Sequence, residues 1–167
     1  MFKIKLLILL LSSISVVSCI NNKIKNDVPN FSIGYIDGEF DGLLLNNLLL
    51  TNLRSLDIYD KNSNFEIKAN INHENTVYIT KIDNTSEREK ITSQLSIDII
   101  NNKAECNIFS EKFTISQFYI FAASDKFLSN QEAIKKIKKD NTDSLIKKLI
   151  SHIYEINYNC YEPNNSN

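Results

Sequence analysis

The spacing of hydrophobic residues changes twice along the chain. Leucines between Leu43 and Leu56 recur every three or four residues, which predicts a first helix with one buried side. From Phe65 onwards apolar and polar residues alternate, which is typical of strands with one solvated face. The helical spacing returns after Asp125, and no Pro or Gly interrupts Gln131–Glu155. The last segment is therefore predicted to be one long amphipathic helix.

Four strands are expected, one before the first helix and three between the two helices. Asp37-Gly38 ends the first strand, and Asp41 is placed to cap the helix that follows. The second strand is predicted to be irregular around His73–Asn75, and a β-bulge near Ser110 reconciles the two parities of the fourth. In chain order the expected strands are Phe31–Ile36, Phe65–Ile71 with its continuation Val77–Asp83, Ile91–Ile100 and Ala104–Gln117.

This order of elements predicts an α+β fold. We expect a two-layer sandwich, with both helices packed on one face of a mainly antiparallel four-stranded sheet. A single domain is expected to span residues 31–157. Residues 158–167 contain Pro163 and four Asn and are expected to form a flexible tail.

The N-terminus has the layout of an export signal. Two lysines precede Leu6–Val17, an apolar run too short to span a bilayer. The boundary that follows, Ser18-Cys19, resembles the signal of bacterial lipoproteins, in which the chain is cut before a cysteine. We therefore expect residues 1–18 to be a signal peptide and residues 19–30 a lipidated tether, with covalent diacylglycerol and an N-acyl chain on Cys19. An ordinary secretory signal is the alternative.

The residue after the cysteine bears on the membrane in which the protein resides. In lipoproteins with this type of signal, an Asp at that position marks retention in the inner membrane, so Ile20 favours the outer membrane. The nearly balanced 19 Lys+Arg and 20 Asp+Glu argue against nucleic-acid binding. With 43% hydrophobic and 23% charged residues, the chain has the composition of a globular protein.

Signs of catalysis and of metal binding are missing from the sequence. The two histidines, His73 in a predicted loop and His152 on the last helix, have no neighbours at a metal-ligand spacing. No phosphate-binding glycine loop, nucleophile elbow or nucleophile–base pair is visible. We expect a protein that is not an enzyme and that carries no cofactor beyond its lipid.

Two groups of residues are candidates for specific roles. Arg88 and Lys90 begin the third strand, and Lys112 of the fourth is expected to approach them. Three cations at one end of a sheet can bind phosphates, although solvated surface charge is the alternative. Cys106 and Cys160 can pair, since an exported compartment permits disulfides, or Cys106 can be a small core residue.

Taken together, the layout resembles the lipopolysaccharide-assembly lipoproteins of the LptE family, especially their divergent alphaproteobacterial forms. The resemblance is best from Glu87 to Leu149, where a strand opens with Glu87-Arg88 and the last helix ends in Leu145-Ile146-Lys147-Lys148-Leu149. Arg88 stands where many relatives carry an arginine. Lys and Ile replace many of the family's Ala and Arg, and the match lies in the order of elements rather than in a motif.

The resemblance implies a non-enzymatic lipoprotein on the periplasmic side of the outer membrane. Such a protein would plug the β-barrel LptD, assist its assembly and take part in lipopolysaccharide transport. Arg88, Lys90 and Lys112 would then be candidates to bind lipid A phosphates. The alternatives are an accessory lipoprotein of an ABC-type lipid transport system and a surface-exposed lipoprotein with an adhesion role.

Overall fold

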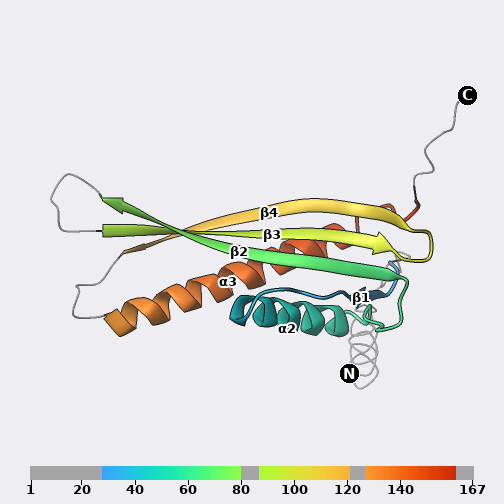
Figure 1. The fold of residues 1–167 in the computed structure, drawn as a ribbon, viewed down its shortest axis with the longest axis horizontal. Coiled ribbons are helices and arrows are strands. Elements are labelled where there is room, and N and C mark those ends of the chain that lie inside the picture. The colour runs from blue at the N-terminus through green and yellow to red at the C-terminus, as the bar shows by residue number, and fades with distance from the viewer. Residues whose placement is uncertain (1–27, 80–86, 121–126, 161–167) are drawn as a thin grey trace, which may run out of the picture.

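The computed structural model describes residues 28–79, 87–120 and 127–160. The signal peptide and Cys19 lie outside these residues. In chain order the elements are β1 (Phe31–Ile33), α2 (Phe40–Ser55), β2 (Phe65–Ile79), β3 (Glu87–Asn101), β4 (Cys106–Ile120) and α3 (Phe127–Ile153). Figure 1 shows three long strands side by side, with both helices on one side of them.

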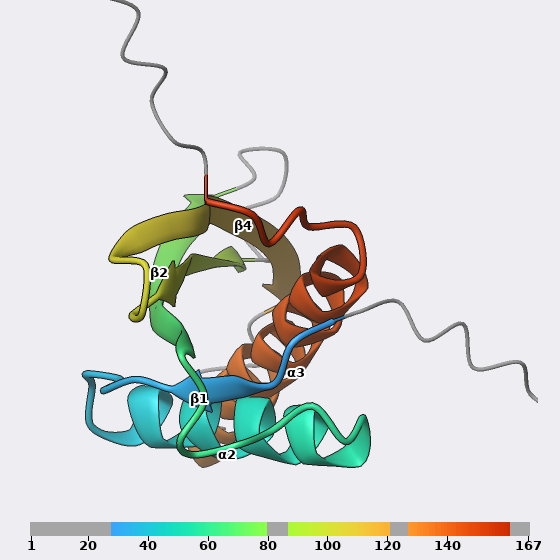
Figure 2. The ribbon, with the colours of Figure 1, turned by 90° about the vertical axis from the view of Figure 1, so that its right-hand side faces the viewer.

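The four strands form one sheet in the order β1-β2-β3-β4. Together with the two helices, this sheet confirms the expected α+β fold. β2, β3 and β4 pair antiparallel, while the short β1 pairs parallel with the start of β2. The view along the strands in Figure 2 shows the sheet curving over α3, with α2 below β1. Alternate residues of β3, from Glu89 to Ile99, are buried on the helix side. We call the opposite side of the sheet its outer face.

Two strand predictions need correction. β2 is continuous through His73–Asn75, because every residue from Phe65 to Ile79 has a partner on β3. The bulge of β4 falls at Ile108 rather than near Ser110, since Ile99 pairs with Phe109 and Ile100 with Asn107. The single extra residue has the predicted consequence, because it lets Phe113 and Ile115 face the helices.

The start of α2 also differs from the prediction. The helix begins at Phe40, one residue before Asp41, and its N-terminus has no side-chain cap. Asp41 lies in the first turn of α2. Its carboxylate interacts favourably with the positive end of the helix dipole there, but it does not cap the helix. Gly42 is required by close packing, because a Cβ atom there would lie 2.4 Å from the carbonyl oxygen of Asp37.

The apolar core lies between the helices and the half of the sheet that contains β1. The packed chain extends past residue 157, where a flexible tail was expected to begin. The Tyr158 ring lies 5.8 Å from Phe31 and 5.7 Å from Phe65, and its hydroxyl donates to the Ile153 carbonyl at 2.6 Å. The main core consists of Phe31, Leu45, Leu49, Leu53, Ile58, Ile67, Ala69, Leu95, Ile97, Ile99, Phe113, Leu145, Ile146, Leu149 and Ile153.

A disulfide joins Cys106, the first residue of β4, to Cys160. The two Cα atoms are 6.1 Å apart, within the ordinary range for a disulfide. The bond therefore ties the segment after α3 to the edge of the sheet, at the end where the main core lies.

Candidate functional site

Cations and exposed apolar side chains lie together on the outer face, at the end of the sheet opposite the main core. This distal end is where β2 ends, β3 begins and β4 ends. Arg88 pairs across the sheet with Ile120, and Lys90 pairs with Phe118. Residues directly opposite in an antiparallel ladder lie on the same face. Phe118 is 65% and Ile120 60% exposed. We call Arg88, Lys90, Phe118 and Ile120 the distal patch.

Lys112 does not belong to this patch, contrary to the prediction. It pairs with Ser96, on the same outer face. At ~3.3 Å per residue, Ser96 lies about 20 Å along β3 from Lys90. The prediction about Lys112 was wrong because the strands are longer than expected. In a shorter sheet, the three cations would have lain at the same end.

The distal patch has the chemistry to bind an amphiphile. A guanidinium and an ammonium group can bind phosphate oxygens, while the adjacent Phe118 and Ile120 offer apolar surface. On the rest of the outer face the described positions are mostly polar, such as Lys68, Asn70, Gln94 and Thr114.

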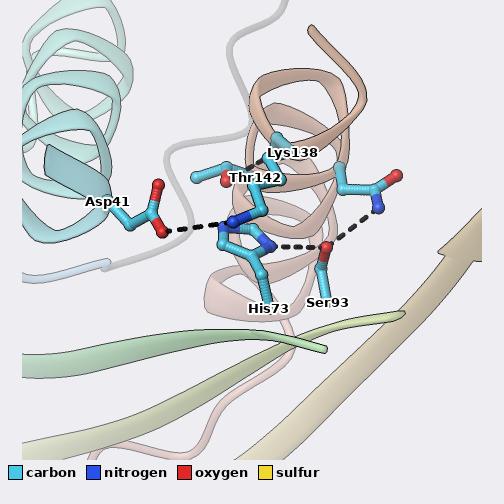
Figure 3. Close-up of polar contacts among 6 residues, drawn as sticks. Asp41, His73, Ser93, Lys138 and Thr142 are labelled. Carbon is cyan, nitrogen blue, oxygen red and sulfur yellow. Dashed lines mark hydrogen bonds and ion pairs between the residues drawn. The ribbon is translucent and has the colours of Figure 1, made fainter. Parts of the chain in front are cut away.

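A second group of polar residues lies between the sheet and α3, where sequence reasoning missed it. His73 of β2, Ser93 of β3 and Asn141 of α3 form what we call the polar layer. His73 Nδ1 lies 2.7 Å from Ser93 Oγ, and Asn141 Nδ2 donates to the same oxygen at 2.9 Å. Figure 3 shows His73 pointing from the sheet toward Ser93 and the helices.

Hydrogen bonding in the polar layer is incomplete. Ser93 and Asn141 are fully buried. Among the described residues, nothing forms a hydrogen bond with the buried atoms His73 Nε2 and Asn141 Oδ1. Each buried polar atom without a partner costs about 1–3 kcal/mol of folding free energy. The layer therefore lowers stability at this point of the interface.

Charged residues of both helices lie beside the imidazole of His73. Lys138 Nζ of α3 is 4.0 Å from Asp41 Oδ2 of α2, and both lie next to His73 in Figure 3. Burial lowers the pKa of His73 below 6.5; Asp41 opposes this effect and Lys138 adds to it. The imidazole is therefore neutral at pH 7.

The contact between Ser93 and His73 is of the kind used in nucleophilic catalysis, but its position differs from that of an active site. The Ser93 side chain has no exposed surface, so a substrate cannot reach its hydroxyl in this conformation. The hydroxyl instead links β3 with β2 and α3. The predicted irregularity at His73 hid this contact. If the alternation from Phe65 is continued, His73 falls on the buried face of the strand.

The described parts of the chain hold no group of three or more His, Cys, Asp or Glu side chains arranged to bind a metal. Within those same parts, no helix combines the length and the apolar character that crossing a membrane requires.

Comparison with known proteins finds neighbours only among solved structures. No family model and no curated protein sequence matches the chain. A minor lipoprotein from Acinetobacter baumannii superposes with a TM-score of 0.55 at 14% identity, covering 81% of this chain and 98% of its own. For a putative lipoprotein from Caulobacter crescentus, the TM-score is 0.54 at 13% identity, with 75% and 88% covered. For the rare lipoprotein B from Shewanella oneidensis, it is 0.52 at 14% identity, with 73% and 94% covered. At these identities the likeness is one of fold.

Proposed function

We propose that this protein is a non-enzymatic lipoprotein, anchored through Cys19 to the periplasmic side of the outer membrane. There it would plug an LptD-like β-barrel, assist the assembly of that barrel and take part in the transport of lipopolysaccharide. The observation that carries the proposal is the fold shared with three bacterial lipoproteins, one of them named rare lipoprotein B. The lipoprotein-type boundary at Cys19 supports it independently.

The outer face of the sheet supports a role inside a barrel. Its described positions are mostly polar, and the lumen of an outer-membrane barrel is polar as well. An acyl anchor on Cys19 would raise the local concentration of the domain at the membrane. The distal patch, with two cations beside two exposed apolar side chains, would contact the phosphates and acyl chains of lipopolysaccharide.

The first test concerns the anchor and the partner. The full-length protein is expressed with its signal in a Gram-negative host, labelled with radioactive palmitate and purified from detergent-solubilised membranes. We expect label on the wild-type protein and none on Cys19→Ala, together with a stoichiometric large β-barrel identified by mass spectrometry. Inner-membrane transporter subunits would favour the ABC-type alternative, and protease sensitivity on intact cells would favour adhesion.

The second test concerns the distal patch. Arg88→Glu/Lys90→Glu is expected to weaken binding of purified lipopolysaccharide at least ~10-fold, because two phosphate-binding cations become acids. The matched control is Lys68→Glu/Lys112→Glu, which makes the same change of charge on the same outer face but away from the patch. Equal losses in both variants would show that only overall charge matters.

A further inference from the structure

An apolar and basic surface lies on the helix side of the molecule, away from the distal patch. The first turn of α2 exposes Phe40 by 69% and Leu43 by 58%. Beside it, α2 and α3 enclose an open hollow of about 350 Å³. Phe40 and Leu44 line it from α2, and Glu132, Lys135, Lys136 and Lys139 line it from α3. Figure 1 shows the start of α2 beside α3.

The charges around this hollow leave two ammonium groups available. Lys135 Nζ lies 3.5 Å from Glu132 Oε1, and Lys138 is held by Asp41. Within the described residues, Lys136 and Lys139 form no ion pair. Both are exposed, next to the protruding ring of Phe40. We call Phe40, Leu43, Lys136 and Lys139 the helix-side patch.

The shape of this patch indicates what covers it. The hollow is open to solvent, and Phe40 projects from the helix. A projecting aromatic ring next to unpaired lysines is the pattern by which proteins insert into the boundary between lipid headgroups and acyl chains. The lysines would bind anionic phosphates of the lipids, while Phe40 and Leu43 would enter the apolar layer.

The position of the expected anchor makes such contact feasible. Val28, the first described residue, packs against the core, and Cys19 precedes it by a segment that spans at most about 30 Å. Lipid on Cys19 would keep the domain that close to the bilayer, so a patch of low intrinsic affinity would be occupied.

We propose that the helix-side patch docks the domain on an anionic phospholipid surface, with the outer face of the sheet turned away from the bilayer. This inference rests on the lipid anchor of the proposed function. It describes the protein before it meets a partner, and it leaves the outer face and the distal patch accessible to that partner.

The chain contains no Trp, so a single introduced Trp reports its own environment. Phe40→Trp is purified with its lipid, checked by intact mass and reconstituted in phosphatidylcholine–phosphatidylglycerol vesicles with brominated acyl chains. We expect blue-shifted emission and strong quenching. The matched control is Thr114→Trp, an exposed position on the outer face, for which we expect emission as in water. Equal quenching at both positions, or none at Phe40→Trp, would overturn the proposal.

The contribution of the lysines is tested in the Phe40→Trp background. Lys136→Gln/Lys139→Gln is expected to reduce quenching in anionic vesicles, and Lys103→Gln/Lys147→Gln, which removes the same charge elsewhere, is expected to leave it unchanged. If the two pairs behave alike, a headgroup site at the helix-side patch is refuted. An intact mass without lipid would count against the anchor, and co-sedimentation of the unlipidated full chain with the same vesicles would then decide docking separately.

Discussion

The interface between β3 and α3 changes character over a single helical turn. At Leu95 and Leu145 both elements contribute buried apolar side chains to the main core. At Ser93, two residues along β3, and Asn141, one turn along α3, the two elements are linked by a hydrogen bond between buried polar groups. Farther along α3, a polar contact to the neighbouring strand β4 follows, in which the Tyr119 hydroxyl donates to Oδ1 of the buried Asn130.

This difference indicates where the stability of the fold resides. Burial of apolar surface contributes about 25 cal/mol per Å², whereas a hydrogen bond exchanged with water contributes only about 1 kcal/mol net. Ile91 is fully buried beyond the polar layer and is not part of the main core. We therefore expect the main core to hold the domain together and the distal end, with its patch, to be the less stable part.

The largest effect is expected from placing a polar group in the main core. Leu145→Asn removes a side chain that is 2% exposed and leaves an amide among apolar neighbours. Lost burial and an unsatisfied amide together should lower the free energy of unfolding by about 3–5 kcal/mol. Urea unfolding followed by circular dichroism measures it, with Ser144→Asn on the exposed side of α3 as control. A loss below ~1 kcal/mol would contradict the proposed role of the main core.

The disulfide should have the next largest effect. It closes a loop with a sequence separation of 54 between Cys106 and Cys160. A loop of this size corresponds to about 2–4 kcal/mol of stabilisation, mainly through the unfolded chain. Cys106→Ser/Cys160→Ser should lower the free energy of unfolding, measured by urea unfolding, by that amount, and a reductant should do the same to the wild type. The double variant has no disulfide between these positions. If a reductant still lowers its urea midpoint, the effect of the reductant does not come from the Cys106–Cys160 bond.

The converse substitution in the polar layer should be nearly neutral. Asn141→Leu removes the hydrogen bond to Ser93 but also removes the buried oxygen that has no partner among the described residues. The two contributions oppose each other, so stability should change by less than about 1 kcal/mol in either direction. Ser93 keeps its contact with His73. A loss as large as that of Leu145→Asn would show that the two regions contribute alike.

The order and class of the elements could be predicted because hydrophobic periodicity records burial. The parity change in β4 required an extra residue, and the structure has one at Ile108. The lengths of the strands could not be predicted in the same way. His73 and Asn75 are polar residues on the helix side of β2, and polar residues at inward positions look like the end of a strand.

The candidate sites were predictable only where neighbours in sequence are also neighbours in space. Arg88 and Lys90 lie two residues apart on one strand, so their shared face follows from alternation alone. Their contact with Phe118 and Ile120 depends on the register between β3 and β4. The register also separates Lys112 from them, and the polar layer depends on three elements meeting at Ser93.

The smallest effect should be a pH dependence of the free energy of unfolding that arises from His73 in the polar layer. We expect it to be small because the imidazole of His73 is only partly buried. Burial lowers the pKa of His73 in the folded protein below its unfolded value of 6.5, with Asp41 opposing and Lys138 adding to the shift. Well above pH 6.5, at about pH 7.5, both states are neutral at this residue, so its contribution to stability is fully present. As the pH falls below 6.5, the unfolded chain binds the proton first and stability declines until the lower, folded pKa is passed. Urea midpoints measured between about pH 7.5 and pH 5 should fall more steeply for the wild type than for His73→Leu. Equal slopes for the wild type and His73→Leu would mean that the decline arises outside the polar layer.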